Sequence, residues 1–178
     1  MKKLLFFCSA LLLLNIANAQ DKKYEISKAD AFTMQRGENI RINSHFLNNL
    51  KGKGFNEFEA EVRQINSSKE TKYFLQLIRL GDFPFTCTIE YADLIKLNTA
   101  LNSFIDNAKK DKALNRDYIE NKIISSEGLE LGYSIDDKGV AWFITFPIDM
   151  KNNYVGFELT EISNCFSSAI KKIQELQN

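Results

Sequence analysis

The sequence predicts an α+β fold in which antiparallel sheets pack with two amphipathic helices. Residues 58–63 and 129–136 alternate apolar with polar side chains, the period of a strand with one solvated face. Residues 94–108 and 162–176 instead place apolar side chains every three or four positions, as a helix with one buried side does. Each helical stretch directly follows a segment rich in β-branched and aromatic residues, which is typical of a strand.

Residues 1–19 have the three parts of a secretory signal peptide. Lys2 and Lys3 form a positive start, an apolar run covers 4–14, and Ala17 and Ala19 supply the small residues of a cleavage site. The apolar run is shorter than the ~20 residues that a membrane-spanning helix needs, which argues against an anchor. The sequence therefore predicts a mature chain that begins at Gln20 and is located in the periplasm or outside the cell.

The predicted mature chain, residues 20–178, is long enough for one domain with a substantial core. The signal segment carries two of the 23 basic residues and no acidic one, so the mature chain has two more acidic than basic residues. It contains no second apolar run of membrane length. A nucleic-acid binder is usually strongly basic, and this balance of charge argues against one.

The elements of the first half follow from local pattern. We expect short strands at 24–26 and 39–42, and a helical turn at 45–50 that ends at two glycines. Three strands follow, at 58–63, 73–78 and 86–91, and the second of them is apolar on both faces. The helix over 94–108 comes next, with Asp93 as its N-cap or as an acid in its first turn.

The second half has a similar order of elements. We expect strands at 119–124 and 129–135, a tight turn at Asp136-Asp137-Lys138-Gly139, and a hairpin partner over 140–146. A strand at 154–159 leads into the helix over 162–176, with Thr160 as its candidate N-cap.

An offset of 68 residues relates the two halves. Ile89–Leu94 aligns with Phe157–Ile162, so that Glu90 matches Glu158 and Asp93 matches Glu161. One sheet with one helix leaves a sheet face uncovered, and two such units can cover each other. The sequence predicts a tandem repeat with pseudo-two-fold symmetry and halves at 20–110 and 111–178.

Two cysteines remain after the predicted cleavage, Cys87 in a strand and Cys165 in a helix. Disulfides persist in exported proteins, so a Cys87–Cys165 bridge is one interpretation. The other is a pair of buried free thiols, because cysteine often packs as a small apolar residue. Both interpretations stay open at the level of sequence.

No catalytic or metal-binding pattern stands out. His45 is the single histidine, and zinc sites and hydrolase triads need further ligands or a nucleophile beside one. Gly52-Lys53-Gly54 has no phosphate-loop spacing, and the turn at 136–139 lacks the oxygen ligands of a calcium loop. Glu90 and Glu158 recur between apolar neighbours, and the outer face of an edge strand explains them. We expect no cofactor and no metal.

These observations favour an exported, non-catalytic binding or accessory protein of the cell envelope or extracellular space, with a protein or small molecule as partner. One alternative is an enzyme with an unpatterned carboxylate or cysteine site. A second alternative is a nucleic-acid-binding protein, because the repeated order of strands and one helix is similar to that of the whirly and PUR type of single-stranded nucleic-acid binders. That resemblance covers element order alone, which does not carry function, and export and charge both disfavour it.

Overall fold

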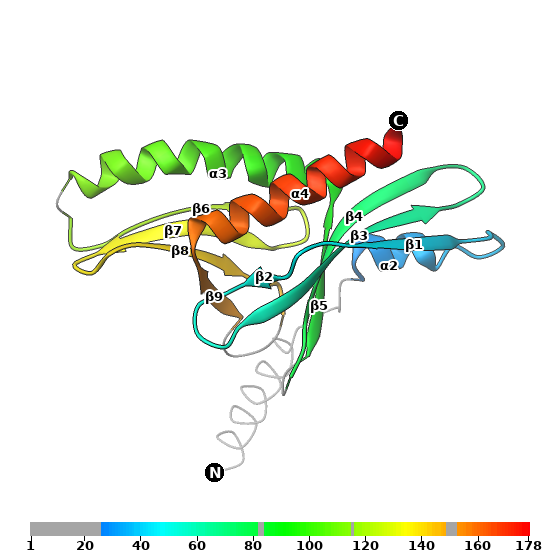
Figure 1. Cartoon of the computed structure of the whole chain (residues 1–178), viewed down its shortest axis with the longest axis horizontal. Helices are drawn as coiled ribbons and strands as arrows, with labels where there is room; N and C mark the ends of the chain where they lie inside the picture. The colour runs from blue at the N-terminus through cyan, green and yellow to red at the C-terminus, as the bar shows by residue number, and fades with distance from the viewer. Residues whose placement is uncertain (1–25, 82–83, 115, 149–152) are drawn as a thin grey trace, which may run out of the picture.

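Antiparallel strands form two sheets in the computed structural model, which describes residues 26–81, 84–114, 116–148 and 153–178 (Figure 1). The five-stranded sheet has the order β1-β3-β4-β5, with β2 also paired to β3. Its strands are β1 (Arg41–Phe46), β2 (Leu50–Lys51), β3 (Glu57–Asn66), β4 (Thr71–Arg79) and β5 (Phe85–Glu90). The four-stranded sheet has the order β6-β7-β8-β9. Its strands are β6 (Ile119–Ile124), β7 (Glu130–Asp136), β8 (Gly139–Thr145) and β9 (Tyr154–Phe157).

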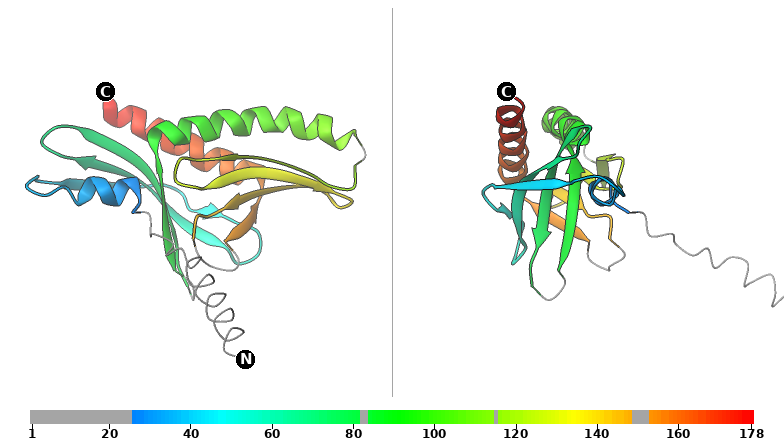
Figure 2. Two further views of the ribbon diagram at one scale, coloured as in Figure 1. Left: turned by 180° about the vertical axis from the view of Figure 1, so that it is seen from behind. Right: turned by 90° about the vertical axis from the view of Figure 1, so that its right-hand side faces the viewer.

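Three helices are described: α2 (Lys28–Thr33), α3 (Tyr91–Lys112) and α4 (Leu159–Gln177). Helices α3 and α4 directly follow β5 and β9 and lie over the two sheets (Figures 1 and 2). Helix α2 packs on the opposite face of the five-stranded sheet, where Ala29 and Phe32 meet Ile65 and Phe74. The predicted α+β class is therefore confirmed.

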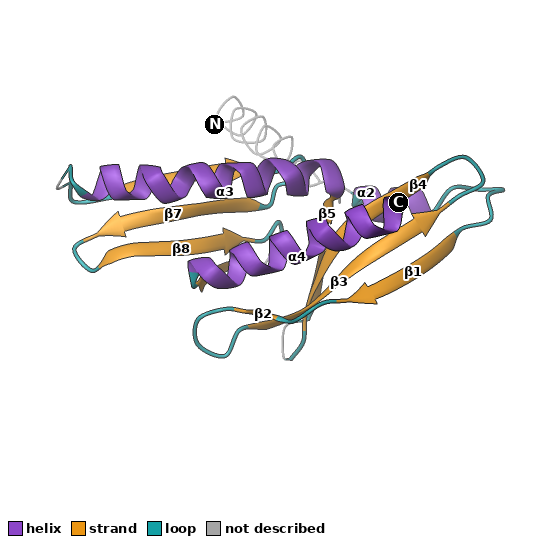
Figure 3. Cartoon of the chain, turned by 45° about the horizontal axis from the view of Figure 1, so that its top comes forward, coloured by secondary structure: helices purple, strands orange, loops and turns teal. Residues whose placement is uncertain are grey.

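Each long helix extends onto the sheet that it does not follow, and α3 also contacts β4 and β5 of the sheet that precedes it. Helix α3 lies along β7, where Phe104 meets the ring of Tyr133 edge-on with their centroids 5.6 Å apart (Figure 3). Helix α4 packs against β3 and β2. Near its end, the hydroxyl of Tyr73 on β4 donates to the carbonyl of Leu176 at 3.2 Å. The two sheets are thus covered by exchanged helices.

The alternation read from the sequence sets which side chains face the helices. Ala60 on β3 pairs with Leu77 on β4 and Val62 pairs with Leu75, and all four are buried. On the other face of β3, Glu59 is exposed as expected, whereas Glu61 is buried and accepts a hydrogen bond from the Gln76 side chain at 3.0 Å. One apolar cluster joins both sheets to both long helices, and Phe58 of β3 stacks in it on Phe146, with ring centroids 4.9 Å apart.

The first turn of each long helix carries an acid that binds the other half of the chain. Asp93 of α3 accepts hydrogen bonds from the backbone N–H of Ser126 at 3.0 Å and from its hydroxyl. Glu161 of α4 accepts from the backbone N–H of Lys51 on β2 at 3.3 Å. Acids in a first turn also suit the positive end of the helix dipole. These contacts fix the point at which each helix crosses to the neighbouring sheet.

Several boundaries differ from the sequence prediction. The helical turn expected at 45–50 is wrong: His45 lies in β1 opposite Val62, and Leu50 begins β2. Thr160 is not the N-cap of the last helix, because Glu158 occupies that position. Asp93 is a first-turn acid rather than a cap. Helix α2 and strand β2 were not predicted, since both are too short to show a period.

The 68-residue offset aligns the starts of some elements of the two halves but not of others, such as β3 and β7. It aligns Thr71 of β4 with Gly139 of β8, and Tyr91 of α3 with Leu159 of α4. Two unrelated β–α units can share such an order, so the duplication and the division into 20–110 and 111–178 stay predictions. The predicted signal peptide, residues 1–19, lies outside the described residues, and its cleavage stays a prediction too. None of the helices described combines the length and apolarity needed to span a membrane.

Replacing Asp93 by asparagine tests the contact between α3 and the second half. Burial alone would raise the pKa of Asp93. Hydrogen bonds from Ser126 and Lys96 and the charge of Lys28 outweigh burial, so that the pKa lies below the ordinary 3.8. A carboxyl group whose pKa is lower in the folded than in the unfolded state stabilises the protein at pH values above its unfolded-state pKa. That stabilisation is lost as the pH falls through the folded-state pKa. We expect D93N to lower the free energy of unfolding by about 1–2 kcal/mol at pH 7 in urea titrations.

The difference between wild type and D93N should shrink as pH falls below 3.8. Asp106→Asn is the matched control on the same helix, because the Asp106 side chain is 73% exposed and forms a surface ion pair with Lys109. We expect D106N to change stability by less than about 0.5 kcal/mol. Equal effects of D93N and D106N at pH 7 would contradict the role given to Asp93.

Gly132 of β7 lies where the structure has no room for a side chain. A Cβ there would lie 2.5 Å from the Asn121 carbonyl oxygen and 2.9 Å from the Phe143 ring. We expect G132A to destabilise the protein by about 1–3 kcal/mol in thermal or urea unfolding. Gly156→Ala on β9 is the control, because its Cβ would meet nothing closer than Lys53 Cδ at 3.5 Å. A G132A protein as stable as G156A would show that β7 does not pack as described.

Candidate functional site

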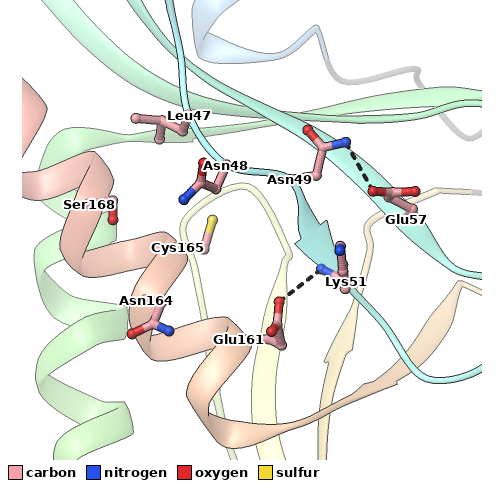
Figure 4. Close-up of a pocket in the computed structure, with 9 residues that line it drawn as sticks. All are labelled: Leu47, Asn48, Asn49, Lys51, Glu57, Glu161, Asn164, Cys165 and Ser168. Carbon is pink, nitrogen blue, oxygen red and sulfur yellow. Dashed lines mark hydrogen bonds between the residues drawn. The ribbon is translucent and has the colours of Figure 1, made fainter.

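A cleft of about 540 Å³ opens between α4 and the outer edge of the five-stranded sheet (Figure 4). Ligand sites in proteins commonly fall within 300–1,000 Å³. Its walls come from the β1–β2 connection, β2, the start of β3, and α4. The lining residues are Leu47, Asn48, Asn49, Lys51, Glu57, Glu161, Asn164, Cys165 and Ser168.

A β-bulge forms the sheet side of the cleft. Phe46 pairs with Glu61 and Leu50 pairs with Phe58, so three residues on one strand lie opposite two on β3. Within this bulge, the backbone N–H of Leu47 still donates to the carbonyl of Ala60 at 2.9 Å. Bulges bend a strand and redirect its side chains. Here the bulge leaves Asn48 and Asn49 exposed, and Asn48 extends toward α4 (Figure 4).

One flank of α4 forms the opposite wall. Glu161, Asn164, Cys165 and Ser168 follow one another at the three- and four-residue spacing that places side chains on one side of a helix. This flank lies beside the buried stripe that packs α4 onto the sheet. Asn164 and Ser168 are exposed, whereas Cys165 is buried at the bottom of the cleft.

Two carboxylates of the cleft are held by internal hydrogen bonds. Asn49 donates from its side-chain nitrogen to Glu57 at 3.1 Å, and the Lys51 backbone donates to Glu161 (Figure 4). Each bond occupies one carboxylate oxygen. The second oxygen of each carboxylate makes no hydrogen bond within the described part of the chain. The cleft therefore contains oriented acceptors before any ligand enters.

A second hollow of about 390 Å³ adjoins the cleft and shares Asn49 and Glu57 with it. Phe55 and Leu80 lie on its border, and both are exposed, Phe55 completely. A fully exposed aromatic ring beside a polar cleft is a feature of contact surfaces more than of cores. Together the two hollows give one concave surface that runs from α4 around the edge of the sheet.

The cleft contains no activated nucleophile. Burial, with the charge of Glu161, raises the pKa of the Cys165 thiol to about 12. The thiolate is the nucleophilic form, so Cys165 is unreactive near neutral pH. Burial and the charge of Glu127 raise the pKa of Cys87 to about 12 in the same way. No group of three or more metal-ligating His, Cys, Asp or Glu side chains occurs among the residues described.

The structure places the two cysteines in different surroundings. Cys87 lies on β5 opposite Leu77, near Glu127, while Cys165 lies on α4 near Glu161. Both are buried and both are free thiols in this structure. Only Cys165 borders the cleft. The geometry corresponds to the free-thiol interpretation, and the bridge remains to be tested by thiol counting.

The other residues considered from the sequence lie apart from the cleft. His45 is half-buried on β1, and its Nε2 is enclosed without a hydrogen-bond partner among the described residues. Glu90 pairs with Lys28 at 2.7 Å and Glu158 pairs with Lys53 at 3.2 Å. The segment 136–139 forms the expected β7–β8 hairpin turn.

Sequence reasoning missed the uncharged polar residues of the cleft, which are Asn48, Asn49, Asn164 and Ser168. One signal for them was available. The polar positions Glu161, Asn164 and Ser168 recur at helical spacing next to the apolar stripe, so they mark a polar flank of one helix. The partner wall could not be found in the same way, because the bulge depends on the register between β1, β2 and β3.

Thiol counting checks the state of the cysteines. We expect folded protein comprising residues 20–178 to show almost no reaction with a thiol reagent at pH 7, because both thiols are buried and protonated. In denaturant without reductant, two thiols should react for each mature chain. Cys165→Ser is the matched control, and it should lower the count by one. A count that rises only after reductant is added would establish the Cys87–Cys165 bridge instead.

The chain was also compared with known proteins. No protein-family model matches it, and neither the curated proteins nor the solved structures contain a match to it.

Proposed function

We propose that this chain is an exported binding protein without catalytic activity, and that the cleft between α4 and the β1–β2 bulge holds its ligand. The proposal depends on one observation: the cleft contains polar side chains that are already oriented for binding, and its cysteine thiol is unreactive. Glu57 and Glu161 are oriented by internal hydrogen bonds. The thiol at the cleft, Cys165, is protonated near neutral pH. Such a site is suited to hold a molecule and poorly suited to transform it.

An enzyme would need a group with a pKa adjusted for proton transfer near pH 7. Burial instead raises the pKa of Cys165, the cysteine at the cleft, to about 12, farther from pH 7. A nucleic-acid site would need a positively charged groove. The cleft carries Glu57 and Glu161 against Lys51, and Glu59 adds a further negative charge in the adjoining hollow. Charge therefore supports a ligand other than a nucleic acid.

The proposal also includes export, which rests on the charged, apolar and small-residue pattern of residues 1–19. Export makes the partner an envelope component or a molecule from outside the cell. Location and binding can be measured on one preparation.

Native mass spectrometry of protein taken from the envelope fraction tests both parts. We expect a chain that begins at Gln20 and a fraction of it carrying a bound ligand. Ser168→Trp should remove the ligand, because Ser168 is exposed in the cleft and an indole would occupy the space. Asn102→Trp is the control, since Asn102 is exposed on α3 and does not line the cleft.

Two results would count against the proposal. Retention of Met1 would overturn export through a cleaved signal peptide. A ligand that stays bound to S168W as firmly as to N102W would place the binding site elsewhere. Circular dichroism and thermal melting of both variants show that the fold is intact, which separates loss of binding from loss of structure.

A further inference from the structure

We infer that the ligand of the cleft is a neutral saccharide, whose hydroxyl groups bind the carboxamides and carboxylates of the cleft while a sugar ring lies against Phe55. The inference rests on the proposed function and adds the chemical class of the ligand. It is drawn from the hydrogen-bonding inventory of the walls, their charge, and the exposed ring next to them.

The uncharged polar residues of the cleft both donate and accept. Each carboxamide of Asn48 and Asn164 offers two N–H donors and one carbonyl acceptor, and the Ser168 hydroxyl offers one donor and two acceptor positions. They stand on both walls. A sugar hydroxyl has the same double character, so adjacent hydroxyls of one ring can satisfy both walls at once.

The charged residues favour a ligand that donates and is not anionic. Glu57 and Glu161 each keep one oxygen free of hydrogen bonds in the described part of the chain. A hydroxyl can donate to such an oxygen in a charge-assisted bond, which is stronger than a neutral one. A phosphate, sulfate or carboxylate would be repelled by both acids. Lys51, at the same wall, disfavours a simple cation.

The adjoining hollow supplies an apolar contact. Phe55 is fully exposed and Leu80 is 60% exposed, and the hollow that they border shares Asn49 and Glu57 with the cleft. The C–H face of a pyranose ring is apolar, whereas its rim carries the hydroxyls. A ligand with both surfaces fits a polar cleft that borders an exposed aromatic ring. An oligosaccharide of a few units can reach both hollows.

An extended peptide is the main competing ligand, and the edge of the sheet argues against it. A peptide that adds to a sheet needs a regular row of free backbone groups along the edge strand. At the cleft this row is broken by the one-residue bulge between Phe46 and Leu50. The backbone N–H of Lys51 is also occupied by Glu161. Side-chain recognition therefore dominates at this site.

Side-chain amide resonances in 15N-resolved NMR spectra give the test. The probes are three neutral trisaccharides, chitotriose, cellotriose and maltotriose, with trialanine and trilysine as peptide probes. We expect at least one trisaccharide to shift the side-chain resonances of Asn48, Asn49 and Asn164 in a saturable way. Neither peptide should shift them.

Matched variants connect the binding to the proposed contacts. Asn164→Ala and Phe55→Ala should each weaken the best trisaccharide at least about tenfold, equivalent to about 1.4 kcal/mol. Asn102→Ala on α3 and Tyr118→Ala before β6 remove an exposed carboxamide and an exposed aromatic ring away from the cleft. They should bind within about twofold of wild type, because a tenfold effect requires a lost contact.

The outcomes separate this inference from the proposed function. Resonances that move for none of the trisaccharides would overturn the saccharide inference, and so would equal binding by N164A and N102A. A shift caused by trialanine or trilysine alone would also overturn it, while binding at the cleft would stand. Consider an envelope ligand that is absent from S168W and yet is not displaced from the wild type by any trisaccharide. That result would overturn the saccharide inference and leave the proposed function intact.

Discussion

The exchange of the two long helices is the constraint on which the rest of the structure depends. An antiparallel sheet with alternating side chains has one apolar face, and that face must be covered. Helix α3 covers β7 and also contacts β4, while helix α4 covers β3, so each sheet depends in part on the helix that follows the other sheet. Asp93 and Glu161 mark the start of each crossing, and each binds a backbone N–H in the other half. The apolar core is consequently shared by both sheets.

The cleft is a by-product of the same exchange. Helix α4 buries Ile162, Phe166 and Ile173 against the sheets, which turns its Asn164 and Ser168 flank toward the edge of the five-stranded sheet. At that edge the bulge between β1 and β2 holds Asn48 outward. A regular edge strand would place fewer polar side chains there. The site thus combines an irregularity of one strand with the less apolar flank of a helix.

Much of the fold could be predicted from the sequence, because most elements have a clear period. Strand β6 has the expected bounds, 119–124, and both long helices follow their apolar stripes. The strand expected at 39–42 overlaps only the start of β1, because the sequence from Arg41 to Phe46 is largely polar and exposed at a sheet edge. The cleft was missed because it brings together residues as distant as Lys51 and Glu161, 110 positions apart. A local sequence pattern cannot indicate that two such distant residues lie side by side.

The sequence separation between α4 and the strands that it covers also affects folding. The inner face of β3 is formed from residues near position 60, yet the helix that covers it spans Leu159–Gln177. Contacts between such distant segments raise the contact order and slow folding. A chain still being synthesised therefore leaves the β2–β3 side of the first sheet uncovered until α4 has been made.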